Sequence, residues 1–237
     1  MKRWNARVLG VFLTCQAVLQ LWPCALAPSP KPSHPADAAA RALRLSIEAA
    51  LQPSTYSARN AEAARSVARD AAVLEGLARP IAWKDGDLDL LNGTWDLIYT
   101  SNGDVDRGNF RQLGWPGQPI LEKVQQEIDV KAGRLRNVLT LSPWPSSSWP
   151  LAGPFQGVLQ ELEAARIVLR LDHSFEAYGQ SRLRIVLDIL DRSLEGPSME
   201  GLASLIPRSS SYPLPLGSAA QLGAGRFDTT VLQGDLR

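Results

Sequence analysis

Cysteine and histidine are scarce in this sequence, and their scarcity excludes much of the chemistry that proteins perform. Both cysteines, Cys15 and Cys24, fall in the amino-terminal leader, residues 1–36, and beyond this leader the only histidine is His173. Disulfides and thiolate nucleophiles need cysteine, and zinc sites are built largely from cysteine and histidine. If the leader is removed, the remaining chain has no disulfide and no cysteine nucleophile, and we expect no metal site.

The sequence also lacks an excess of charge of either sign. Lys and Arg total 25 against 24 Asp and Glu in 237 residues. Nucleic-acid-binding domains usually carry a basic surplus, so we expect no nucleic-acid partner. The 17 prolines and 18 glycines are more typical of a protein of strands and loops than of a helical bundle. The length and the 45% apolar content suffice for one sizeable core.

No catalytic arrangement is evident. The chain has no G-x-S-x-G elbow to supply a serine nucleophile, and His173 directly follows Asp172 at a predicted strand end, which favours a turn residue. Asp172, Asp188 and Asp191 fall on predicted strand exteriors or ends, where solvated charges are expected. A glycosidase-like acid pair among them is the alternative. We therefore predict no catalytic residues, no cofactor and no enzymatic activity.

Residues 1–27 have the pattern of a secretory signal peptide. A positively charged stretch precedes the mostly apolar residues 8–21, and an A-x-A-like cleavage site ends at Ala27. The apolar stretch is shorter than the roughly 20 residues that span a bilayer. A retained membrane anchor is the alternative, because Pro28 directly after the site disfavours cleavage there.

Residues 28–36 form a linker that resembles a transit peptide. They are rich in Pro and Ser and contain no acid, as is typical of plastid transit peptides. A signal peptide followed by such a segment is the arrangement needed to reach a plastid that lies inside extra membranes. Ordinary secretion with a Pro-rich leader explains the same residues and stays open.

Residues 37–80 are predicted to form a helical lead-in. Apolar residues recur at helical spacing over 37–52 and 57–79, and a proline follows each stretch. Ser57 is the predicted N-cap of the second helix. Both apolar faces are small and rich in alanine, which indicates helices packed against a larger body. A membrane-surface helix is the alternative, because the first helix carries arginines on its polar side.

Residues 81–237 have the pattern of a β domain that begins at residues 91–103. There Trp95, Leu97 and Tyr99 alternate with polar side chains, which predicts a strand with one buried face. Gly93 next to this pattern is typical of the end of a small barrel. A large aromatic ring plugs such an end, and glycine lets the backbone approach closely.

The rest of the β domain supplies further strands. They are predicted at 124–130, 134–142, 155–162, 166–172, 181–190 and 226–232, with a weak strand near Phe110. The first two form one hairpin and the next two another. In the strand over 181–190, Leu183, Ile185, Leu187 and Ile189 are predicted to point inward, and residues 195–217 are predicted to form a loop. This number of short strands suits a closed barrel whose interior takes side chains or one small ligand.

Aromatic residues are the candidates for contact with a ligand. Trp95, Tyr99, Phe155 and Phe175 are predicted to line a cavity for a hydrophobic molecule, with Gly93 beside the barrel plug. A packed core is the simpler interpretation of the same rings.

Three stretches of this sequence resemble one family. LNGTWDLIYTS is followed by VQQEIDVKAGRLRNVLTL and then by GRFDTTVLQGDLR. In this order they are similar to the plastid lipid-associated protein (PAP)/fibrillin family, over roughly residues 37–237. The chain departs from the family pattern at Val231, where the family has tyrosine, and at Gln233 and Gly234, where it has acids. Family members usually continue beyond Arg237 with a further strand, so a truncation here is expected to leave an open barrel edge.

The resemblance implies a mainly β fold, a lipocalin-like antiparallel β-barrel preceded by an α-helical N-terminal segment. It implies plastid targeting through the signal and transit segments, and association with thylakoids or plastoglobules. The implied function is non-enzymatic: the protein binds or organises lipids and other hydrophobic molecules such as carotenoids, quinones or fatty acids. Two alternatives stay open, an enzyme or enzyme-assisting subunit in plastid quinone or lipid metabolism, and a secreted lipocalin-like carrier.

The plug at Trp95 carries one further expectation. An arginine on a strand is predicted to stack on this ring as a cation–π cap, and Arg237 and Arg184 are the two candidates.

Overall fold

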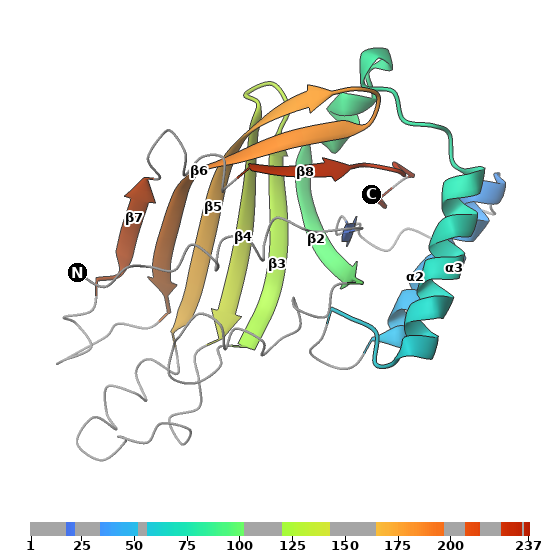
Figure 1. Cartoon of the computed structure of the whole chain (residues 1–237). Helices are drawn as coiled ribbons and strands as arrows, with labels where there is room; N and C mark the ends of the chain where they lie inside the picture. Colours follow the sequence, from blue (N-terminus) through green and yellow to red (C-terminus); the bar gives the residue numbers. More distant parts are fainter. Residues whose placement is uncertain are drawn as a thin grey trace.

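The computed structural model describes residues 18–21, 34–51, 56–101, 120–142, 165–196, 207–213, 224–233 and 235–237. Two helices, α2 (Pro35–Ala50) and α3 (Ala61–Leu77), follow the first strand and precede the remaining strands of an antiparallel sheet (Figure 1). Two short 3-10 helices, η1 (Trp83–Asp85) and η2 (Asp87–Leu91), lead into the sheet. The strands are β1 (Val18–Leu21), β2 (Gly93–Thr100), β3 (Ile120–Asp129), β4 (Arg134–Ser142), β5 (Arg166–Tyr178), β6 (Arg182–Glu195), β7 (Ser209–Pro213) and β8 (Ala224–Asp228).

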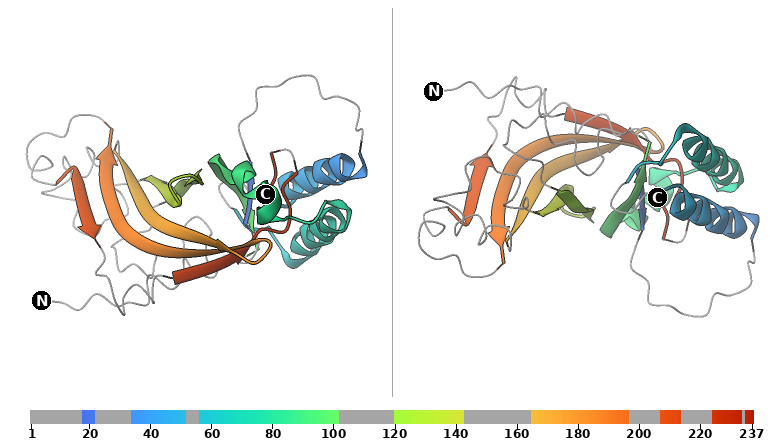
Figure 2. Two further views of the ribbon diagram at one scale, coloured as in Figure 1. Left: turned by 90° about the horizontal axis from the view of Figure 1, so that it is seen from above. Right: turned by 90° about the horizontal axis from the view of Figure 1, so that it is seen from below.

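The sheet has eight strands in the order β1-β2-β3-β4-β5-β6-β7, and β8 also pairs with β6. The long strand β6 meets β8 through residues 182–186 and β7 through residues 189–193. Among the described strands no pairing joins β1 to β7. The paired strands therefore form an open sheet, whereas the sequence predicted a closed barrel. The sheet is nevertheless strongly curved, and the two helices lie beyond its β2 side (Figure 2).

Much of the predicted strand order is present. The mainly β fold with a helical lead-in is confirmed, and so is the hairpin of β3 and β4. The predicted partner of residues 166–172, residues 155–162, lies outside the described residues, as does the weak strand near Phe110. In the structure β5 pairs with β4 and β6.

Several strand limits differ from the prediction. β5 continues to Tyr178, well beyond its predicted end at residue 172, because Asp172 pairs with an arginine on the outward face and His173 is buried on the inward face. The predicted loop over 195–217 contains β7. The closing strand β8 ends at Asp228, and the chain then continues as a tail, residues 229–237.

A β-bulge changes which side chains of β6 point inward. The register between β5 and β6 shifts at Asp172 and His173, which pair with Ile189 and Leu187. Asp188 is the extra residue, so Asp188 and Ile189 both lie on the outward face, and Leu190 takes the inward position. The predicted inward orientation of Ile189 was therefore wrong, because strict alternation does not hold across a bulge.

Both helices begin at side-chain caps. The Oδ1 atom of Asn60 accepts a hydrogen bond of 2.8 Å from the backbone N–H of Ala63, so α3 begins at Ala61 and the predicted N-cap at Ser57 was wrong. For α2 the cap is His34, whose Nδ1 accepts from the backbone N–H of Ala36 at 3.3 Å, with Pro35 in the first turn.

The two helices pack as the lead-in to the β domain. Their buried apolar side chains form one cluster with Tyr99 of β2 and with Val231 and Leu236 of the tail. None of the described helices is long and apolar enough to cross a membrane. β1 lies inside the apolar residues 8–21 and pairs with the edge of β2, so cleavage after Ala27 would remove the strand that covers that edge.

The tail residue Leu236 provides a stability test of this packing. Leu236 is fully buried, with 0% of its surface exposed, whereas Leu45 of α2 is 65% exposed. We expect Leu236→Ala to lower the free energy of unfolding by about 2–5 kcal/mol through lost burial and the cavity left behind. The matched variant Leu45→Ala should change it by less than about 0.5 kcal/mol. Urea denaturation followed by circular dichroism measures both, and equal effects would contradict this packing.

Candidate functional site

The candidate site is the end of the sheet where β2 begins. Trp95 is only 4% exposed there, and its indole N–H donates a hydrogen bond of 2.8 Å to the backbone carbonyl of Leu91 at the end of η2. Gly93 has φ 133°, a conformation that side-chain-bearing residues rarely adopt, so glycine allows the chain to turn from η2 into β2. The hydrogen bond therefore holds the ring against the end of η2.

Arg237 is the arginine that caps the ring. Its guanidinium lies 5.2 Å from the centre of the Trp95 ring, within the range of a cation–π interaction. Arg184 is exposed on β6, so of the two predicted candidates the structure has Arg237 in this position. Burial lowers the pKa of Arg237 to about 9, which still leaves the group protonated at neutral pH. The plug therefore contains a buried positive charge.

A short chain of hydrogen bonds continues from the plug across the sheet. Arg237 donates through Nη2 to the Oε1 atom of Gln126 on β3, and the Nε2 atom of Gln126 donates to Oδ1 of Asn137 on β4 at 2.8 Å. Trp95, Gln126 and Asn137 are directly opposite one another in the strand register, so they form one row on the inward face. The row satisfies polar groups that burial would otherwise penalise.

The tail that carries Arg237 is attached to both helices. Val231 and Leu236 pack in the helix cluster, and three polar contacts accompany them. These contacts are Arg44 with Asp235, Thr230 with Glu75 at 2.8 Å, and Gln233 with Asp37 at 2.7 Å. The backbone N–H of Thr229 also donates to the carbonyl of Ser181 at 2.9 Å. The tail thus joins the helices, the sheet and the Trp95 plug.

The predicted ligand-contacting residues do not form a single group. Trp95 and Phe175 belong to one buried cluster, which also contains Trp83 of η1. Tyr99 packs in the helix cluster instead, where burial raises the pKa of its hydroxyl. Phe155 lies outside the described residues. Sequence patterns alone predicted that these rings are buried but not which of them share a cluster.

Gln126 and Asn137 were missed as members of the site, although Gln126 gave a usable signal. It lies between Val124 and Ile128 on the apolar side of an alternating strand, where an unpartnered amide would be costly. A polar residue in such a stripe predicts a buried partner. The identity of that partner, a residue 111 positions further along the chain, was not predictable from the pattern.

His173 does not lie in the predicted turn. It lies within β5, is 3% exposed, and pairs with Leu135 of β4 and Leu187 of β6 on the inward face. Burial lowers the pKa of its imidazole. The backbones of Leu171 and Leu135 and the charges of Asp188 and Asp172 raise that pKa only in part. The ring is therefore neutral at neutral pH.

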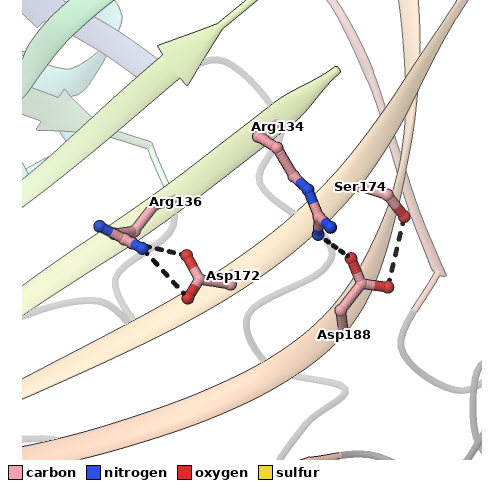
Figure 3. Close-up of polar contacts among 5 residues, drawn as sticks. All are labelled: Arg134, Arg136, Asp172, Ser174 and Asp188. Atoms are coloured by element: carbon pink, nitrogen blue, oxygen red, sulfur yellow. Dashed lines mark hydrogen bonds and ion pairs between the residues drawn. The ribbon is translucent and has the colours of Figure 1, made fainter. Parts of the chain in front are cut away.

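The outward face of the same strands carries paired charges (Figure 3). Asp172 accepts two hydrogen bonds from Arg136, at 2.5 and 3.3 Å, and Asp188 accepts from Arg134 at 2.9 Å and from Ser174 at 3.3 Å. The pairing with Asp172 raises the pKa of Arg136. These two carboxylates, the candidates for a glycosidase-like acid pair, are each paired with an arginine.

Within the part of the chain that the structure describes, no group of three or more His, Cys, Asp or Glu side chains is placed to hold a metal ion.

The fold and this end of the sheet define a mainly β protein with a helical lead-in and an inward face closed at one end by a tryptophan and an arginine. A family model described as PAP_fibrillin matches residues 54–237, most of the chain, and the protein belongs to this family. The match includes α3 and all strands from β2 onward. Comparisons with curated proteins and with solved structures gave no match. Membership implies a plastid lipid-associated role, in a family that is generally structural and not enzymatic.

Removal of the plug ring should destabilise the folded protein strongly. We expect Trp95→Ala to lower the free energy of unfolding by about 3–5 kcal/mol, because it removes a buried ring and leaves the Arg237 guanidinium without its aromatic contact. Tyr212→Ala, at an exposed ring on β7, is the control and should change stability little. A Trp95→Ala variant as stable as the wild type would show that the ring is not structural.

Acid should destabilise the protein in part through His173. The folded state keeps the ring neutral, while the unfolded chain binds a proton near pH 6.5, so this contribution to stability is complete above about pH 7 and is lost as the pH falls below about 6.5. We expect His173→Phe to lose less stability than the wild type across this window in urea titrations. Parallel losses in the two proteins would refute a buried neutral histidine.

Proposed function

We propose that the protein binds hydrophobic molecules against the inward face of the sheet and acts without catalysis at thylakoids or plastoglobules. Carotenoids, quinones and fatty acids are the ligand classes in view. The observation that supports this proposal best is the composition of the inward face. Leu97, Leu139, Leu171 and Leu187 make it apolar, and it carries few polar groups.

The proposal includes closure of the curved sheet into a lipocalin-like barrel. A strongly curved antiparallel sheet with a plugged end is consistent with such a barrel (Figure 2). Because the tail and the helices lie at the Trp95 end, we place ligand entry at the opposite end. The side chains there are those of Leu121, Leu141 and Ile167.

Apolar area would supply most of the binding free energy. A lipid chain that buries about 300 Å² of apolar surface gains on the order of 7 kcal/mol before the costs of association are subtracted. A surface of this kind selects ligands by length and shape, and any further selectivity requires one of the polar groups on the inward face.

The delivery route belongs to the same proposal. The signal peptide over residues 1–27 and the transit-like linker over residues 28–36 would direct the chain to a plastid, where the lipids and membranes named above occur. We expect the full-length chain with a carboxyl-terminal fluorescent tag to accumulate in plastids. Fluorescence in the secretory pathway or the medium would favour the secreted carrier instead.

Lipid recovery tests the binding function directly. We expect the protein purified from plastids to carry hydrophobic molecules detectable by mass spectrometry. Leu169→Gln, on the inward face of β5, should reduce the amount, whereas Arg170→Gln, the next residue and on the opposite face, should not. Absence of lipid together with turnover of a lipid substrate would replace the binding function with an enzymatic one.

A further inference from the structure

His173 places one polar atom in an otherwise apolar part of the inward face. Its neighbours across the sheet are Leu135 and Leu187, and the flanking inward residues of its own strand are Leu171 and Phe175. The side chain is almost completely buried. Any hydrogen-bonding atom of this ring therefore faces hydrocarbon, unless a specific partner is present.

The Nδ1 atom of His173 has no such partner among the described residues. The nearby acids do not supply one, because Asp172 and Asp188 lie on the outward face, where Arg136 and Arg134 engage them (Figure 3). The backbones of Leu171 and Leu135 raise the pKa of the imidazole, which is the effect of carbonyl groups near a ring N–H. A neutral imidazole has one N–H donor and one acceptor nitrogen. We assign the N–H to Nε2, so that Nδ1, the buried nitrogen without a partner, is the acceptor.

A water molecule is a poor partner for this nitrogen. A stably buried water usually makes about three hydrogen bonds, and the surrounding side chains are apolar. The polar end of a lipid is a better partner, because its apolar chain is retained by the same surface that surrounds the histidine. The partner must also be a donor, since Nδ1 only accepts.

We propose that Nδ1 of His173 accepts a hydrogen bond from the hydroxyl group of an apolar ligand, so that the protein selects long-chain or isoprenoid alcohols over equally apolar molecules without a donor. This inference rests on the proposed lipid-binding function. A site of this kind divides the ligand classes. Hydroxylated isoprenoids, quinols and fatty alcohols fit it, whereas hydrocarbons, quinones and ionised carboxylates have no hydrogen-bond donor for Nδ1.

A matched pair of probes tests the proposal with the purified full-length chain. The probes are 1-hexadecanol and hexadecyl methyl ether, which share the alkyl chain and the oxygen but differ in the hydroxyl hydrogen. Displacement of a fluorescent fatty-chain probe gives both affinities. We expect the wild type to bind the alcohol roughly tenfold more tightly than the ether, the effect of one buried hydrogen bond.

Three variants assign the preference to the histidine. His173→Phe keeps an apolar ring and removes the acceptor, so the alcohol should bind no better than the ether, with ether affinity unchanged. His173→Gln, which retains an acceptor oxygen, should recover part of the preference. Ser174→Ala, the neighbour on the outward face, should behave as the wild type does. A preference that survives in His173→Phe would overturn the proposal.

The wild type alone decides the question if the variants do not fold. Equal affinity of the wild type for the alcohol and the ether would overturn the hydroxyl site and leave the lipid-binding function intact. Binding of neither probe would count against the lipid-binding function itself and so against the site that depends on it.

Discussion

The structure depends on a buried positive charge held against an aromatic face. Arg237 lies over Trp95, and its guanidinium donates to Gln126, which is bonded in turn to Asn137. A buried guanidinium is costly unless its donors and its charge are satisfied, so the tail must be in place before this end of the sheet is complete. Since the tail also packs on α2 and α3, the helices are tied to the β domain through the same interaction.

This arrangement explains why three separated stretches of sequence belong together. The first stretch supplies Gly93 and Trp95, the second supplies Gln126 and Asn137, and the last supplies Arg237. Each is unremarkable as a local pattern, but the sheet register aligns the first two in one row and the tail adds the third. The three stretches that resemble the family therefore also supply the residues of the Trp95 plug, while the proposed lipid-binding role rests on the apolar surface beside them.

Local patterns predicted the elements well where one face of a strand is buried without interruption. The β3–β4 hairpin was predictable in this way. The arginine over Trp95 was expected from the plug at the barrel end, and the choice between Arg237 and Arg184 required the path of the tail. The errors arose at residues whose place in a strand depends on contacts with residues far away in the sequence. Asp172 and His173 suggested a strand end, but β5 continues because Asp172 forms an ion pair on the outward face and His173 is buried on the inward face. The bulge at Asp188 then places the side chain of Ile189 on the outward face.

The coupling between Trp95 and Arg237 is the central claim, and a double-mutant cycle measures it most directly. The free energy of unfolding would be determined for the wild type, Trp95→Leu, Arg237→Met and the double variant. A stabilising interaction energy of about 1–2 kcal/mol is expected, in the range of a desolvated cation–π pair. Additive effects of the two substitutions would contradict the claim that this contact closes the end of the sheet.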